Sequence, residues 1–218
     1  MSLVQIGLFP LPGFVLFPRT AVPLHIFEPR YVRLVRDSLK ANKRLALGQL
    51  RRGWEKDYYG APAAFRTVTM ARILDHEELP NDRYNILVEG IERAAVAEVV
   101  REKPYRLVKV RSVRDVMPES DMAAIAESRR ELVLHCERLA LHVPELSGSL
   151  TNLENTHLHP GIIADQMAAL LVKEAYERQS LLDEPSVRRR LELVNVQLRT
   201  LLMAHEEPNE RVFESDEL

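Results

Sequence analysis

The spacing of apolar residues changes near Pro118, and this change constrains the fold more than any other feature of the chain. Before it, apolar and polar residues alternate in short segments, such as those that begin at Val22 and Tyr84. After it, apolar residues recur at steps of three and four, most regularly from Val187 to Leu201. Alternation is typical of strands with one buried face, and steps of three and four are typical of amphipathic helices. We therefore predict a β-rich first part and a helical second part.

The first part is predicted to form an antiparallel sheet that curls toward a barrel. Besides the segments at 22–26 and 84–89, strands are expected at 45–50, 66–75, 91–100 and 105–114. One helix interrupts them, because Pro29 suits a first helical turn and an apolar stripe follows it as far as Asn42.

Three helices are predicted in the second part. The first follows Pro118 and carries apolar residues from Ile125 to Val143, the second runs from Ile162 to Ala175, and the third begins after Pro185. The polar stretch 147–159 is interpreted as a loop. The residues from 205 to 218 are rich in Glu and Asp and are interpreted as a solvated acidic tail.

Charge and cysteine content restrict the class of partner and the compartment. The chain has 30 Lys and Arg residues and 32 Asp and Glu residues, which give a net charge of −2. A protein with this charge has no overall electrostatic attraction for nucleic acid or anionic membranes. The single cysteine cannot form an intramolecular disulfide, and this favours a reducing cytoplasm. The proline-interrupted start is unlike a signal peptide, and no apolar run reaches the roughly 18 residues that span a bilayer. We expect a cytoplasmic protein without a membrane segment.

Several short motifs occur in a fixed order along the chain. The opening carries Leu-Phe-Pro-Leu-Pro-Gly-Phe from Leu8, and Val-Pro-Leu-His-Ile-Phe-Glu-Pro-Arg-Tyr from Val22. Further segments are Ala71–Ile73, Val88–Arg93 with Gly90 at a hairpin motif, and Glu177–Asp183 near the other end. Together these motifs resemble the Lon protease N-terminal, substrate-binding domain family. The chain departs from that family at Val68, where relatives usually have glycine.

The resemblance implies an α+β fold, with a PUA-like β pseudo-barrel at residues 1–116, a helical bundle at 117–204 and the tail at 205–218. It also implies a stand-alone member that lacks the ATPase and peptidase domains, because no G-x-x-x-x-G-K-[ST] loop is present and no room remains for a Ser-Lys peptidase. The expected partners are other proteins or peptides, and no cofactor, metal or catalytic residue is expected.

The segment from Arg51 to Gly60 is the first candidate for partner binding. It holds the only tryptophan, Trp54, and two tyrosines, Tyr58 and Tyr59, among several charges. Such a composition suits recognition of a peptide or a stacked base, and the alternative is that the rings cover one end of the barrel. Phe14 is a second candidate, either exposed at the turn beside Gly13 or plugging the barrel.

Two other groups have a functional and a structural interpretation. His157 and His159, with Glu154 and His142, could form a zinc cluster, but an apparent loop favours solvated histidines. Cys136 lies on the apolar stripe of a predicted helix, which favours a buried structural thiol over a nucleophile.

The sequence therefore predicts a non-catalytic protein-binding module that binds unfolded or extended segments of other proteins. The alternative is RNA binding, since PUA-like barrels occur in RNA-associated proteins, although the net charge disfavours it. An uncharacterised enzyme is a third possibility for which the sequence offers no positive signal.

Overall fold

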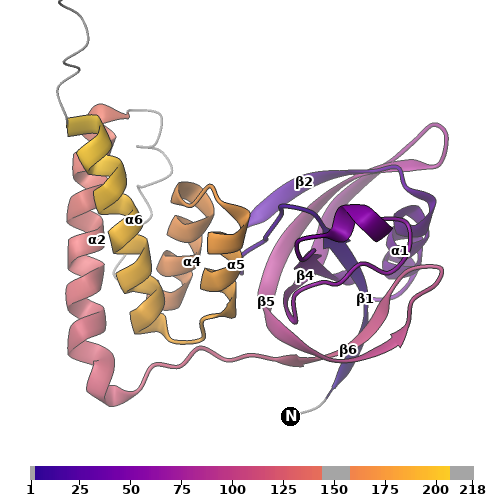
Figure 1. The fold of residues 1–218 in the computed structure, drawn as a ribbon, viewed down its shortest axis with the longest axis horizontal. Helices are drawn as coiled ribbons and strands as arrows, with labels where there is room; N and C mark the ends of the chain where they lie inside the picture. Colours follow the sequence, from indigo (N-terminus) through magenta and orange to yellow (C-terminus); the bar gives the residue numbers. More distant parts are fainter. Residues whose placement is uncertain (1–2, 144–157, 207–218) are drawn as a thin grey trace, which may run out of the picture.

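The computed structural model describes residues 3–143 and 158–206, which form a ring-like sheet with one helix and, beside it, a group of helices (Figure 1). Residues 144–157, which hold most of the predicted loop, and residues 207–218, which hold most of the predicted acidic tail, lie outside the described part. The α+β architecture and the order of its two parts are confirmed. The domain limits at 116 and 204 stay predictions.

The strands of the described residues form one mixed sheet of six strands that closes on itself. Neighbouring strands follow the order β2-β5-β4-β3-β1-β6, and an additional pairing between β5 and β6 completes a ring of five strands with β2 outside it. The strands are β1 (Val4–Leu11), β2 (Ala21–Ile26), β3 (Arg44–Gln49), β4 (Thr67–Leu79), β5 (Arg83–Arg101) and β6 (Leu107–Ser112).

The expectation of a purely antiparallel sheet is wrong at one position. β1 and β3 are parallel, with Leu8 opposite Ala46 and Leu11 opposite Gln49. Between these two strands the chain leaves the ring and forms β2 and α1 (Pro29–Lys40). It then returns to the ring as β3, beside β1. A crossover of this length allows parallel pairing, which a tight hairpin does not. The alternation of apolar and polar residues within a strand does not indicate whether that strand pairs in parallel or antiparallel with its neighbour.

The expectation of separate strands at 84–89 and 91–100 is also wrong, because both belong to β5. Gly90 lies inside this strand, whereas the hairpin between β4 and β5 turns at Asn81 and Asp82, both with positive φ. A Cβ at Gly90 would lie 2.3 Å from the carbonyl oxygen of Phe17. Glycine is therefore required by a close backbone approach, and not by a hairpin turn.

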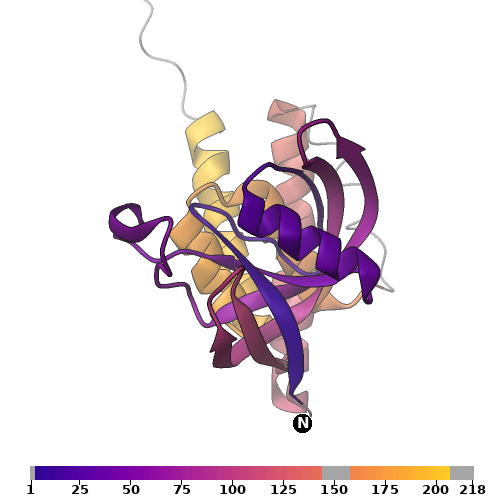
Figure 2. The same ribbon diagram turned by 90° about the vertical axis from the view of Figure 1, so that its right-hand side faces the viewer.

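Two cores belong to the sheet. Helix α1 begins at Pro29 and buries Tyr31, Val32, Leu34 and Val35 against the sheet, and Figure 2 shows it in front of the strands. The second core includes residues of all five ring strands, and its members are Ile6, Leu8, Ala46, Val68, Met70, Ala94, Val108 and Val110.

Val68 is accommodated in the second core by the glycine on the neighbouring strand. A Cβ at Gly48 would lie 2.9 Å from Cγ1 of Val68, so the absence of a side chain at Gly48 leaves room for the valine. The departure from the family pattern at Val68 is thus compatible with an uninterrupted strand through Thr67–Met70.

Four α-helices and a short 3₁₀ helix, η2 (Glu119–Asp121), follow the sheet within the described residues. The α-helices are α2 (Met122–His142), α4 (Pro160–Leu171), α5 (Ala175–Asp183) and α6 (Val187–Glu206). The prediction of one helix from Ile162 to Ala175 is wrong, because the backbone is extended at Val172 and at Glu174. Val172 is buried although its backbone is extended. Its apolar side chain therefore fits the helical spacing in the sequence, but the helix ends before it.

Helices α2 and α6 lie side by side and run in the same direction (Figure 1). Asn195 donates to the carbonyl oxygen of Ser128 at 2.8 Å, and Arg199 pairs with Glu131 at 2.9 Å. None of the helices in the described part is long and apolar enough to cross a bilayer.

The helical core reaches into the ring part of the chain. Val15 and Phe17, which lie between β1 and β2, belong to the core formed by α2, α4, α5 and α6. Buried ion pairs join the same parts, because Arg93 of β5 pairs with Asp165 of α4. Apolar contacts and buried ion pairs therefore both hold the helices against the ring.

Candidate functional site

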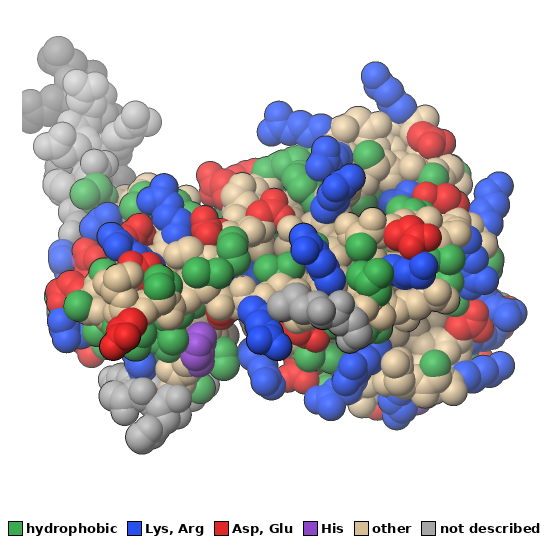
Figure 3. Space-filling view, turned by 90° about the horizontal axis from the view of Figure 1, so that it is seen from below, with side chains coloured by type: hydrophobic (Ala, Val, Ile, Leu, Met, Phe, Trp, Pro, Cys, Tyr) green, Lys and Arg blue, Asp and Glu red, His purple; other side chains and the backbone are tan. Residues whose placement is uncertain are grey.

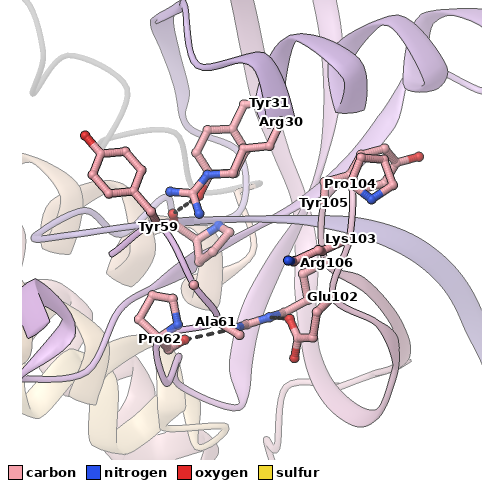
Figure 4. A pocket seen from close by; sticks show the side chains of 12 residues that line it. Arg30, Tyr31, Tyr59, Ala61, Pro62, Glu102, Lys103, Pro104, Tyr105 and Arg106 are labelled. Atoms are coloured by element: carbon pink, nitrogen blue, oxygen red, sulfur yellow. Dashed lines mark hydrogen bonds and ion pairs between the residues drawn. The ribbon is translucent and has the colours of Figure 1, made fainter. Parts of the chain in front are cut away.

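A hollow of about 340 Å³ lies at one end of the ring. Figure 4 shows its walls, which are the start of α1, the loop that follows β3 and the connection from β5 to β6. We call it the tyrosine pocket, because three of its lining residues are tyrosines. The lining residues are Pro10, Arg30, Tyr31, Tyr59, Gly60, Ala61, Pro62, Glu102, Lys103, Pro104, Tyr105 and Arg106.

Arg30 fixes the loop after β3 to the start of α1. Its Nη1 donates to the carbonyl oxygen of Tyr58 at 3.0 Å, and its guanidinium lies 4.6 Å from the ring centre of Tyr31 and 5.0 Å from that of Tyr58. Glu28 holds the same arginine in an ion pair at 3.0 Å and accepts a hydrogen bond from the Tyr58 hydroxyl. The loop wall of the pocket is therefore tied to the helix by several polar contacts.

Two of the three tyrosines are buried and held by hydrogen bonds. The Tyr31 hydroxyl donates to the Pro10 carbonyl oxygen at 3.4 Å, and the Tyr105 hydroxyl donates to Asp37 at 3.0 Å. Burial raises the pKa of both phenols, and for Tyr105 the Asp37 carboxylate raises the pKa further. Both are neutral at physiological pH and offer fixed aromatic surface.

Tyr59 differs from the other two, because 87% of its surface is exposed. Its ring packs edge to face against Tyr58, with the centres 5.3 Å apart. A large, exposed aromatic ring beside a hollow is a common feature of protein-binding surfaces, where aromatic residues are enriched.

The charges of the pocket are unequally neutralised. Arg106 pairs with Glu102 at 2.7 Å and also donates to the Pro62 carbonyl oxygen at 3.0 Å, across the pocket. Arg30 is paired with Glu28. Within the described residues, Lys103 has no acidic partner, and Figure 4 shows its side chain extending toward the middle of the hollow.

The structure brings three of the four predicted partner-binding residues together. Trp54, in the 3₁₀ helix η1 (Trp54–Asp57), packs edge to face on Tyr58 with the ring centres 5.4 Å apart, and Tyr58 packs on Tyr59. Phe14 lies elsewhere, partly buried against the core between α1 and the sheet. Trp54 and Tyr58 are half-buried and Tyr58 is held by Glu28, so Tyr59 lies nearest to free solvent. A binding role for these residues stays a prediction.

Sequence reasoning missed the rest of the pocket. Arg30, Lys103 and Arg106 carry no local signal of a site, and Tyr31 falls within the apolar stripe predicted after Pro29 and is buried on α1. Pro104 and Tyr105 belong to the connection between β5 and β6, and β6 begins at Leu107, two residues later than predicted. A cluster of tyrosines and prolines scattered over the sequence has no spacing rule that would reveal it.

The other two candidate groups receive structural roles. The Cys136 thiol is buried, donates to Sδ of Met167 at 3.9 Å, and has its pKa raised by burial to about 12, so the interpretation as a buried thiol is confirmed. Nδ1 of His159 accepts a hydrogen bond from the backbone N–H of Gly161 at the start of α4. His157 and Glu154 lie outside the described residues, among which no group of three or more potential metal ligands is found.

Comparison with known proteins gives one family. The model of the ATP-dependent protease La (Lon) substrate-binding domain matches residues 5–200. The Lon protease of Anaeromyxobacter dehalogenans is 29% identical over 189 residues, and Lon protease 2 of Myxococcus xanthus is 29% identical over 191 residues. Each alignment covers 86% of this chain but 22% of the relative, so the chain spans about a fifth of the length of these curated proteins.

Two solved structures share the fold. A Lon N-terminal domain protein from Xanthomonas campestris has a TM-score of 0.59 at 23% identity, and the match covers 88% of this chain and 98% of the other. The N-terminal domain of the Mycobacterium avium complex Lon protease has a TM-score of 0.67 at 17% identity, with 90% and 98% covered.

Proposed function

Because the chain belongs to the family of the Lon protease substrate-binding domain, we propose that it is a non-catalytic module that binds segments of other proteins. The observation that carries the proposal is the tyrosine pocket, in which buried rings and prolines form the walls and Tyr59 stands exposed at the side. A side chain of a partner that enters the pocket would lose water from apolar surface on several sides at once, which is the main source of affinity in protein recognition.

The walls are suited to bind without rearrangement. Tyr31 and Tyr105 are held by hydrogen bonds, and the loop that carries Tyr59 is tied to α1 through Arg30. Preformed walls lose little conformational freedom on binding, so more of the contact energy appears as affinity. The partner would be an unfolded or extended segment, because such a segment exposes side chains that a folded protein buries.

Pairing of a partner strand at the open edge of β2 is less favourable. β2 pairs with β5 on one side and carries Pro23, which has no N–H to donate. Proline on an edge strand opposes the addition of a further strand. The pocket is therefore the preferred site of this proposal.

RNA binding receives less support from the face drawn in Figure 3. On the face drawn in Figure 3, basic and acidic side chains are interspersed, and no large basic area free of acidic residues is visible. Affinity for RNA depends mainly on neutralised phosphates, which requires clustered Lys and Arg residues.

A direct test measures the fluorescence anisotropy of a labelled, permanently unfolded protein, such as carboxymethylated casein, titrated with the chain. Tyr59→Ala should weaken binding by roughly fivefold or more, the effect of losing an interface residue worth about 1 kcal/mol. The matched control is Leu141→Ala on α2, since Leu141 is 81% exposed and lies far along the chain from the pocket. Equal losses for both variants, or no binding by the wild type, would overturn the proposal. The casein should also remain uncleaved when ATP is present.

A further inference from the structure

The acidic side chains around the tyrosine pocket are already engaged, whereas one of its cations is not. Glu102 is held by Arg106 at 2.7 Å, and Glu28 is held by Arg30 at 3.0 Å and by the Tyr58 hydroxyl. These contacts neutralise the two arginines. Lys103 remains without an acidic partner within the described residues, so the lining carries an uncompensated positive charge beside aromatic walls.

We propose that the tyrosine pocket selects acidic segments of partner proteins, and that Lys103 determines this specificity by pairing with an Asp or Glu side chain of the segment. The inference rests on the proposed function and names the chemistry of the segment that the pocket accepts.

The geometry favours such a segment in two respects. Lys103 lies on the connection between β5 and β6, and Tyr59 lies on the loop at the other side of the pocket, so one bound segment would contact both residues. Lys103 is exposed, and a bound segment that lies over it would cover part of the ion pair and strengthen the pair relative to a fully exposed one.

The pocket is also partly open to solvent, although Arg106 crosses it to reach the Pro62 carbonyl. A chain can therefore enter and leave without ending there, so we assign the carboxylate to a side chain and not to a chain terminus. The aromatic and proline walls would contact the apolar residues that flank it.

The test uses three labelled peptides with blocked N-termini and a Gly-Ser background. The first carries Asp beside Tyr and an amidated C-terminus, the second replaces that Asp with Asn, and the third is the Asn peptide with a free C-terminal carboxylate. Anisotropy should show the Asp peptide binding roughly two- to fivefold more tightly than the Asn peptide, the range of one partly exposed ion pair. The difference should shrink as salt is raised, because the screening length falls to about 3 Å at 1 M.

Variants assign the effect to Lys103. Lys103→Gln should bind the Asp and Asn peptides equally, Lys103→Arg should keep the preference, and Lys173→Gln, an exposed lysine on the helical side, should behave as the wild type. Circular dichroism checks that each variant is folded.

The outcomes separate this inference from the proposed function. Equal binding of the Asp and Asn peptides by the wild type, or a preference that survives Lys103→Gln, overturns the role of Lys103 but leaves the binding module in place. Preference for the free carboxylate peptide overturns the assignment to a side chain. Absence of binding by all peptides and by the unfolded casein overturns both.

Discussion

The backbone favours glycine at positions 90 and 13, but for different reasons. A Cβ on Gly90 would lie 2.3 Å from the Phe17 carbonyl oxygen, whereas around Gly13 there is open space and the constraint is a φ of +64°. Asparagine tolerates a positive φ better than alanine, but it cannot remove a steric overlap.

Substitutions at the two glycines should therefore respond differently. Gly90→Ala and Gly90→Asn should both lower the free energy of unfolding by about 2–3 kcal/mol through overpacking. Gly13→Ala should cost about 1 kcal/mol, and Gly13→Asn should recover most of that. Urea denaturation measures all four, and a Gly90→Ala variant as stable as the wild type would contradict the close approach.

Cys136 should be chemically inert in the folded protein. Its pKa is raised by burial to about 12, so the nucleophilic thiolate is scarce at pH 8 and the sulfur is inaccessible. A disulfide reagent such as DTNB should leave the native protein unmodified at pH 8 and modify one thiol per chain in denaturant. Rapid modification without denaturant would refute a buried thiol.

The raised pKa of Cys136 also predicts a dependence of stability on pH. The unfolded thiol ionises near its ordinary pKa of 9.0, before the folded one does. The stability that the neutral thiol contributes is complete below that pH and is lost as the pH rises toward 12. Cys136→Ala should therefore lose less unfolding free energy than the wild type between these pH values.

At the scale of elements, a buried charge cluster joins β5, α4 and α6. Arg93 contacts Asp165 with two hydrogen bonds and donates to the Leu182 carbonyl oxygen at 3.1 Å. Arg190 lies 3.3 Å from Asp165 and 2.9 Å from Asp115. The cluster fixes the helices relative to the ring, since each charge loses its partner if the elements separate.

Removing the central carboxylate should therefore be costly. Asp165→Asn leaves two buried arginines undercompensated and should reduce the free energy of unfolding by about 3–5 kcal/mol. The control is Glu192→Gln on α6, which breaks an exposed pair with Arg188 and should cost less than about 1 kcal/mol. The melting temperatures of both variants, measured by thermal unfolding, compare the two losses of stability. Similar melting temperatures would contradict the role of the cluster.

At the scale of the whole molecule, Phe17 couples the two parts. It precedes β2 in the chain, yet its side chain is fully buried in the core of α2, α4, α5 and α6. The helical core is therefore incomplete without a residue from the ring part, and we expect the described part to unfold as one cooperative unit.

Phe17→Ala tests this coupling. It should cost about 3–5 kcal/mol by leaving a cavity, and it should lower the transitions of both parts together. Far-ultraviolet circular dichroism follows mainly the helices, and fluorescence of Trp54 follows the loop beside the ring. Phe27→Ala is the control, because Phe27 is 61% exposed and should change stability by less than about 0.5 kcal/mol. Two separate transitions would contradict the coupling.

Most of the fold could be predicted from the sequence, but most of the pocket could not. Alternation at Tyr84 and Ile86 and the regular steps from Val187 to Leu198 identified buried faces that the structure confirms. The pocket combines Tyr31, Tyr59 and Lys103 from three segments distant in the chain. The aromatic composition of the loop after β3 pointed to Tyr59, whereas nothing local marked Lys103.

The sequence alone determined the type of each part and the family, because hydrophobic period and motifs are local properties that each segment carries by itself. Only the tertiary structure decided the parallel pairing of β1 with β3, the continuity of β5 through Gly90, the break between α4 and α5, and the assembly of the pocket. These depend on contacts between residues far apart in the chain, and such contacts arise from packing that no local pattern encodes.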